Sequence, residues 1–355
     1  MLPQACAGKA ARVPDAVVLG ASDLLTLCAH LNGAAPITPV PAAALRETHD
    51  YPDLKDVVGQ AAARRALEIA AGGGHNLLLS GPPGTGKTLL ASRLPGILPP
   101  MSREEALVSL ALHDFESSGQ GAESLRRPFR NPHHSASAAA LIGGGSRPRP
   151  GEASLAHGGV LFLDELPEFN RRCLEVLREP LESGQVILSR ANSKLSYPAS
   201  FQLVAAMNPC PCGFLGDPNR GCRCSPDQVQ RYAGRISGPL LDRIDIFVTV
   251  PRLPPASLLC EGGNAEPSAE VRARVTRCRE LQQQRQHCSN ADLDSRRLHR
   301  ACELGQAQRA ILEQAAARMH LSGRAIHRVM RVARTIADMD SADQIGEQHL
   351  TEALA

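Results

Sequence analysis

The stretch Gly81-Pro82-Pro83-Gly84-Thr85-Gly86-Lys87-Thr88 decides the fold of this 355-residue chain. It follows the apolar run 76–80 and precedes a second apolar run that begins at Leu89. A buried strand, a glycine-rich loop and a helix start, in that order, are the context of a phosphate-binding loop. The glycines let backbone N–H groups surround a polyphosphate, and the helix N-terminus adds a favourable dipole. We therefore predict that residues 81–88 bind a nucleotide.

Two acidic residues follow a later apolar strand and extend this prediction. The strand 160–163 ends at Asp164 and Glu165. Beside a phosphate-binding loop, Asp164 and the Thr88 hydroxyl would hold Mg²⁺, Lys87 would reach the β- and γ-phosphates of ATP, and Glu165 would polarise the attacking water. Acids often end strands without any catalytic role, but their position after the loop favours the catalytic interpretation.

The strand 202–207 ends at Asn208, whose amide could orient the same water. The alternative is a turn-forming Asn before Pro209. Arg243 lies just before the last strand and could reach the γ-phosphate of a neighbouring subunit. A surface Asp–Arg pair is an equal alternative for Arg243, and Arg235 is a rival for the same role.

A basic helix begins near Ser322, and Arg324 on its first turn could fold back over the nucleotide. The alternative for this helix is a solvated basic face, and we expect Arg331 and Arg334 to lie on that face.

The composition limits the possible partners and compartments. The formal net charge is +3, so nucleic-acid affinity must come from local patches, and the absence of tryptophan disfavours base stacking. The apolar stretches are too short and interrupted to span a bilayer, and the N-terminus lacks the features of a signal peptide. Eleven cysteines without a secretion signal indicate a reducing, cytoplasmic location.

The alternation of short apolar strands with helices predicts an α/β fold with a mostly parallel sheet and helices on both faces. We expect the nucleotide-binding domain over 50–251, linkers over 36–49 and 252–267, and a small all-helical domain over 268–355. Residues 1–35 contain a strand-like run at 16–19 and a helical pattern over 23–31, which Ser22 or Asp23 could cap.

Four cysteines within the loop 210–224 form two close pairs: Cys210 with Cys212, and Cys222 with Cys224. Four thiolates separated by turn-forming glycines suit a tetrahedral zinc site. The Cys-X-Cys pairs are tighter than the usual spacing, so free thiols are the alternative.

Two basic segments could present cations to a phosphate backbone. One is 141–151, with Arg147 and Arg149, and the other is 186–195, which predicts a β-hairpin with Arg190 and Lys194 beside its turn. For either segment alone, a solvated surface turn is the simpler interpretation.

Taken together, these motifs resemble an AAA+ ATPase of the group that contains magnesium chelatase motor subunits and MCM helicases. The motifs are the stretch 56–60, the phosphate-binding loop, the segment 163–165, Asn208 and the stretch 237–245. The run 127–145, with the letters RPFRNPHHSASAAALIGGG, is more specific and resembles the YifB/ComM family over nearly the whole chain.

The resemblance implies a homohexameric ring ATPase, and for ComM a DNA helicase that drives branch migration during natural transformation. It implies that 141–151 and 186–195 face the ring pore, that Asn208 and Arg324 sense the nucleotide, and that Arg243 acts in trans. It also implies a larger N-terminal domain of the Lon/S5 type, of which residues 1–35 would be the last strand and helix.

Two rival functions follow from the same motifs. The first is a chelatase motor that remodels a protein partner inserting a metal into a tetrapyrrole. The second is a regulatory module that binds ATP and hydrolyses little, against which the intact Lys87, Asp164 and Glu165 argue.

Overall fold

The computed structural model describes residues 1–13, 15–41, 46–47, 50–113, 124–145, 148–190, 193–217, 220–254, 256 and 265–355. The chain divides into two compact units, Met1–His49 with Met101–Arg126 and Asp50–Pro100 with Arg127–Ala355. Among the described residues, no helix combines the length and apolar character that crossing a bilayer requires.

The first unit has a small core around Ala7, Ala11 and Val18. Its elements are β1 (Leu2–Pro3), α1 (Gln4–Ala10), β2 (Gly20–Ala21), α2 (Leu24–Leu31), β3 (Arg46–Glu47), α5 (Arg103–His113) and β5 (Ser124–Leu125). The predicted helix over 23–31 is confirmed, and the Asp23 carboxylate caps it by accepting from the Thr26 amide at 2.7 Å. The strand expected at 16–19 is wrong, because the regular pairing with β1 begins only at Gly20.

The second unit is built on a five-stranded sheet in the order β13-β4-β12-β9-β6, in which every neighbouring pair is parallel. Its strands are β4 (Leu77–Ser80), β6 (Phe129–Arg130), β9 (Val160–Leu163), β12 (Gln202–Met207) and β13 (Ile246–Thr249). The prediction of a parallel α/β fold is therefore confirmed. Because all strands run the same way, their carboxyl ends meet at one edge of the sheet.

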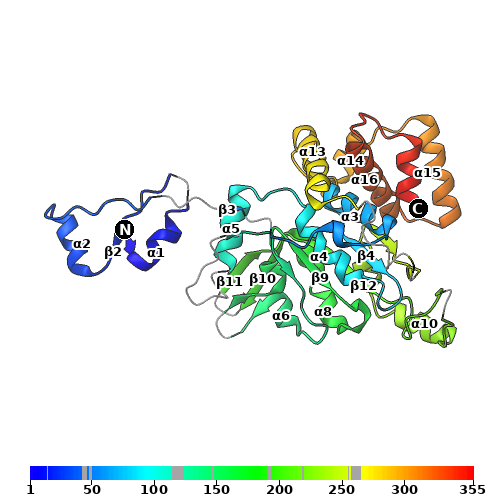
Figure 1. Cartoon of the computed structure of the whole chain (residues 1–355), viewed down its shortest axis with the longest axis horizontal. Coiled ribbons are helices and arrows are strands. Elements are labelled where there is room, and N and C mark those ends of the chain that lie inside the picture. Colours follow the sequence, from blue (N-terminus) through cyan, green and yellow to red (C-terminus); the bar gives the residue numbers. More distant parts are fainter. Residues whose placement is uncertain are drawn as a thin grey trace. The chain divides into compact units, whose positions relative to one another are not determined.

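Side chains along each strand alternate between two hydrophobic cores, one on each face of the sheet. Leu77, Leu79 and Phe162 enter one core, whereas Leu78 and Leu161 enter the other. Helices cover both faces (Figure 1). The helices of this part of the unit are η1 (Leu54–Asp56), α3 (Ala61–Gly73), α4 (Lys87–Ile97), α6 (Ala138–Ile142), α7 (Glu152–Leu155), η2 (Leu166–Glu168), α8 (Arg171–Glu175), α9 (Arg178–Ser183), α10 (Pro226–Ala233) and α11 (Gly238–Leu241).

The C-terminal segment is helical throughout its regular structure and forms a group of its own in Figure 1. It contains α13 (Ser268–Gln286), α14 (Ser295–Ala301), α15 (Gln306–Met319), α16 (Gly323–Met339) and α17 (Glu347–Leu354). Helices α14 to α17 share a core that includes Leu298, Met330 and Leu350. They also pack on the sheet domain, because Val275 of α13 joins the core beneath α3 and Ile336 of α16 contacts Ile69.

The expectation that Arg331 and Arg334 lie on a solvated face is wrong. Arg334 is only 2% exposed, donates to the Asp338 carboxylate at 3.0 Å and also reaches two backbone carbonyls. Arg331 donates to the Leu293 carbonyl at 2.6 Å. A guanidinium has five N–H donors, so burial is tolerated where a charge partner and several acceptors are present.

Candidate nucleotide-binding site

The predicted phosphate-binding loop joins β4 to α4, as the sequence pattern requires. Gly86 caps α4 with φ +88°, a left-handed conformation that glycine adopts without strain. A cavity of about 410 Å³ lies over this loop at the carboxyl edge of the sheet. Its lining joins the loop to the ends of two other strands: Pro83, Gly84, Thr85, Gly86, Lys87, Thr88, Asp164, Glu165, Met207 and Asn208.

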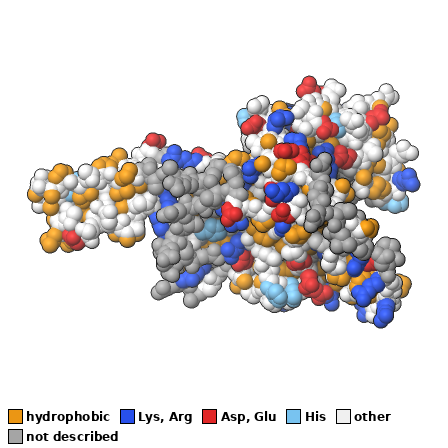
Figure 2. Space-filling view, in the orientation of Figure 1, with side chains coloured by type: hydrophobic (Ala, Val, Ile, Leu, Met, Phe, Trp, Pro, Cys, Tyr) orange, Lys and Arg blue, Asp and Glu red, His pale blue; other side chains and the backbone are white. Residues whose placement is uncertain are grey.

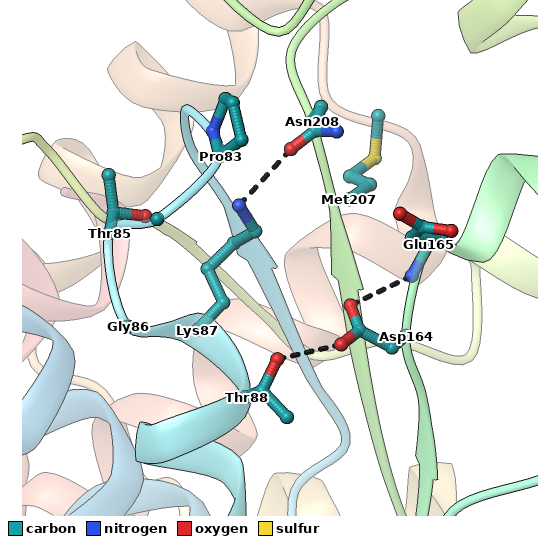
Figure 3. A pocket seen from close by; sticks show the side chains of 10 residues that line it. Pro83, Thr85, Gly86, Lys87, Thr88, Asp164, Glu165, Met207 and Asn208 are labelled. Atoms are coloured by element: carbon teal, nitrogen blue, oxygen red, sulfur yellow. Dashed lines mark hydrogen bonds between the residues drawn. The ribbon is translucent and has the colours of Figure 1, made fainter.

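Lys87 is the first residue of α4, and its ammonium group is held by three acceptors. Its Nζ donates to the carbonyls of Gly81 and Pro82 at 2.7 and 2.9 Å and to Asn208 Oδ1 at 3.2 Å. Burial lowers the pKa of Lys87, and the charges of Asp164 and Glu165 partly oppose this effect. The Lys87 ammonium group therefore links the phosphate-binding loop to Asn208 at the end of β12, as Figure 3 shows.

Thr88 and Asp164 form a pair on the other side of the cavity. The Thr88 hydroxyl donates to Asp164 Oδ2 at 2.7 Å, and Asp164 Oδ1 accepts from the Glu165 amide at 2.9 Å (Figure 3). A hydroxyl and a carboxylate this close offer the hard oxygen donors that Mg²⁺ prefers, so these residues fit that ion.

Glu165 has an unusual backbone conformation for a residue with a side chain, with φ +53°. Left-handed non-glycine residues are strained and gather at functional sites. The Glu165 carboxylate lies 3.4 Å from His134 Nδ1, and both side chains are partly exposed. His134 follows β6, whose two residues are too few to read as a strand, so sequence reasoning assigned it no role.

Gln60 is a second residue near the site that sequence reasoning assigned no individual role. It is buried, and its side-chain amide donates to the carbonyls of Thr85 and Pro251 at 3.3 and 2.8 Å. The amide thereby ties the phosphate-binding loop to the segment that follows β13. Its position just before α3 was the available signal, but burial cannot be read from a single glutamine in a sequence.

The three candidate arginines do not line the cavity of their own chain. Arg243 is paired with Glu182 and donates to the Pro239 carbonyl. Burial, followed by the charge of Arg178, lowers the pKa of Arg243. Arg324 is 74% exposed in its side chain and lies 3.3 Å from Asp242, whereas Arg235 is paired with Glu168 at 2.8 Å.

The two basic segments form neighbouring hairpins. The pair β7 (Gly143–Gly144) and β8 (Arg149–Pro150) is antiparallel, as is the pair β10 (Gln185–Arg190) and β11 (Ser193–Pro198). The Tyr197 hydroxyl donates to the Pro148 carbonyl at 3.0 Å and so connects them. Arg149 and Lys194 are exposed, whereas Arg147 and the side chain of Arg190 lie outside the described residues.

The four cysteines of the 210–224 loop converge. Their sulfur atoms all lie within 4.8 Å of one another, with Cys210 buried and the other three partly exposed. Cys210 Sγ is 3.4 Å from Cys212 Sγ and 3.7 Å from Cys222 Sγ.

A basic surface next to this loop was not singled out from the sequence. Lys and Arg side chains gather over α10 in Figure 2, at the lower right. Exposed arginines of the loop and of α10 supply this charge: Arg220, Arg223 and Arg231. These arginines do not recur at a regular spacing in the sequence, so the sequence alone does not group them.

Two family models match the chain. The model for magnesium chelatase, subunit ChlI, covers residues 53–258, and the model for the C-terminal part of that subunit covers residues 265–355. The first match contains every residue of the cavity, and the second contains the C-terminal helices.

Individual relatives agree with these matches. The chain is 50% identical to YifB of Salmonella typhimurium and 51% identical to YifB of Escherichia coli, in each case over 94% of this chain and 66% of the relative. It is 48% identical to the competence protein ComM of Haemophilus influenzae over 98% of this chain and 69% of the relative. The chain thus spans about two thirds of the length of these relatives. It belongs to the magnesium chelatase ChlI family, and within that family it resembles the YifB and ComM proteins.

Proposed function

We propose that this chain hydrolyses ATP and works as a ring-shaped motor on DNA. The observation that supports hydrolysis best is the convergence of Lys87, the Thr88–Asp164 pair and Glu165 around one cavity. This set supplies a cation for the phosphates, oxygen donors for Mg²⁺ and a carboxylate for water. Phosphate release from ATP by the purified chain should require Mg²⁺ and stop with a chelator. A chain that binds ATP but releases no phosphate would contradict the proposal.

In this mechanism the chain's residues position and polarise the reactants. Lys87 exchanges its carbonyl and Asn208 contacts for β- and γ-phosphate oxygens, which stabilise the ammonium in this buried place. Thr88 and Asp164 would hold Mg²⁺, which neutralises phosphate charge when bound. Glu165 orients the attacking water and accepts its proton, and the Asn208 amide aligns that water with the γ-phosphate.

His134 is proposed to position Glu165, because its imidazole is the side chain in contact with that carboxylate. His134→Ala is expected to lower kcat about tenfold with little change in KM, since His134 does not line the nucleotide cavity. His134→Gln, which can still donate to the carboxylate, should restore most of the rate. Steady-state kinetics of the parent and the two variants measure these changes in kcat and KM. A His134→Ala enzyme that is faster than the parent would contradict the proposal and show that the His134–Glu165 contact is inhibitory.

The proposed DNA contact is the surface formed by the two joined hairpins. Both present exposed cations, and among the described residues only Tyr197 supplies an aromatic ring there, with its hydroxyl engaged. Such a surface suits phosphates more than bases. The printed name of the competence protein ComM supports a role in DNA uptake, and the family resemblance supports helicase or branch-migration activity.

Arg190→Ala with Lys194→Ala should weaken DNA binding and reduce the slope of log affinity against log salt by about two, because two phosphate contacts are lost. Basal ATP hydrolysis should persist, since Lys194 does not line the cavity and Arg190 is not among the residues proposed to act on the nucleotide. The double variant Arg309→Ala with Arg318→Ala removes the same charge from exposed positions on α15 and is the matched control. Equal losses of DNA affinity in both double variants would show that the hairpin is a surface turn and not a DNA contact.

Assembly into a homohexamer is part of the proposal. Arg243 does not line the cavity of its own chain, which leaves it available to a neighbour once its pairing with Glu182 is released. Arg324 would act in the same shared site from α16. The proposed cofactors are ATP and Mg²⁺, with zinc at the four-cysteine cluster, and the proposed location is the cytoplasm.

The alternative is a chelatase-type motor that remodels a protein partner, which the family match itself favours. DNA-stimulated ATP turnover separates the two functions. DNA should raise the rate of ATP hydrolysis by a motor that works on DNA. A chelatase-type motor should change its rate of ATP hydrolysis only in response to its protein partner.

A further inference from the structure

The sulfur positions in the 210–224 loop fit a metal better than disulfides. The Sγ atoms of Cys210, Cys212 and Cys222 are 3.4, 3.6 and 3.7 Å apart, and all four sulfurs, that of Cys224 included, lie within 4.8 Å of one another. Disulfide sulfurs lie about 2.05 Å apart. Zinc–sulfur bonds of about 2.3 Å, directed to the corners of a tetrahedron, place sulfurs about 3.8 Å apart. Four soft thiolates in this arrangement select zinc over hard cations.

We infer that this zinc site controls ATP turnover, because its loop is built into the nucleotide site. The inference rests on the proposed hydrolysis of ATP. Gly213 follows the ligand Cys212, has φ +82° and is buried. A Cβ there would lie 2.7 Å from Pro83 Cδ, so the backbone of the metal loop packs directly on the phosphate-binding loop.

Both ends of the metal loop also converge on Asn208. Asn208 stands two residues before the ligand Cys210, and its side chain accepts from Lys87 Nζ. After the last ligand, α10 carries the buried Tyr232, whose phenolic oxygen accepts from the backbone N–H of Asn208. The residue proposed to align the attacking water is therefore held by both ends of the loop that the metal closes.

A third anchor fixes the middle of the loop. The Asp217 side chain is fully buried and accepts from Arg252 Nε at 3.3 Å. Arg252 stands one residue after Pro251, whose carbonyl is bound by Gln60, which also binds Thr85 of the phosphate-binding loop. Loss of the metal frees four cysteines between these anchors and lets Pro83 and Asn208 move away from Lys87.

Metal binding is tested with the reduced full chain. Purification without chelators should yield about one zinc per chain. Replacement by Co²⁺ should give thiolate-to-metal charge-transfer absorption and the visible bands of a tetrahedral ion. Both signals should be lost in Cys222→Ser/Cys224→Ser and kept in the matched control Cys6→Ser/Cys28→Ser, which removes two exposed thiols of the other unit. Absence of metal in the reduced parent overturns the site, whatever its ATPase activity.

Coupling is tested by ATP turnover and nucleotide binding in the same proteins. The metal-free double variant should turn over ATP at least about tenfold more slowly than the parent, and the Cys6/Cys28 control should match the parent. Gly213→Ala should keep the metal and still slow turnover, because the added methyl displaces Pro83. This second variant keeps the test decisive if the cysteine variant unfolds.

Each outcome has one meaning. If zinc binds but Gly213→Ala, and parent stripped of zinc and then resupplied with Mg²⁺, hydrolyse ATP at the parental rate, the coupling is wrong. If the zinc-loaded parent hydrolyses no ATP, the proposed function fails, whereas the cobalt spectrum still decides the metal site.

Discussion

Replacing Glu165 with glutamine is expected to lower ATP turnover by at least about 100-fold while ATP remains bound. Glutamine keeps the shape of the side chain but cannot accept a proton from water. The Thr88–Asp164 pair and Lys87 stay in place, so the phosphates and Mg²⁺ keep their partners. Phosphate release and binding of a fluorescent ATP analogue, measured on the same preparation, give the two quantities.

Lys87→Ala is the contrasting variant. It removes the one cation among the described residues that line the cavity, so binding itself should be lost. A Glu165→Gln enzyme that turns over ATP at the parental rate would show that another group activates the water. His133, His134 and Asp164 are titratable side chains that line a cavity together with Glu165, and they would be the next candidates.

Arg243→Ala is expected to reduce turnover by about 1,000-fold, the magnitude typical of an arginine that stabilises the transferring phosphoryl group. Binding of ATP should be nearly unchanged, because Arg243 does not line the cavity of its own chain. Arg235→Ala is the comparison variant, since Arg235 is the rival for this role and is also paired with a glutamate on the same unit.

Mixing Arg243→Ala with Glu165→Gln subunits tests whether the site is shared between chains. Each variant lacks a different half of a shared site, so some interfaces in mixed rings regain both halves and activity returns. Recovery would support an arginine that acts in trans. No recovery despite demonstrated co-assembly would assign Arg243 to its own chain or to its structural pairing with Glu182.

The parallel sheet and the phosphate-binding loop could be predicted because both depend on local sequence. Strands such as 160–163 are apolar throughout since both faces of the sheet are covered, and glycine is required where Gly86 turns into α4. Polar residues at the ends of these strands meet because parallel strands end at one edge. The convergence of Asp164 and Asn208 on the loop follows from that geometry.

Other features depend on contacts between distant segments and could not be read in this way. Arg334 looks like a surface cation in the sequence, but it is buried against Asp338 and carbonyls of the following turn. The contact of His134 with Glu165 depends on a two-residue strand, β6, that pairs with β9. The packing of Gly213 on Pro83 joins segments that are 130 positions apart in the chain, and no local pattern encodes it.

The measurement that tests the central proposal most directly is ATP-dependent branch migration of a mobile four-way DNA junction by the purified 355-residue chain. We expect that the branch point migrates only with ATP and Mg²⁺, that DNA accelerates phosphate release, and that Glu165→Gln binds the junction without moving it. A chain that hydrolyses ATP at a rate indifferent to DNA, and leaves the junction intact, would contradict the DNA motor.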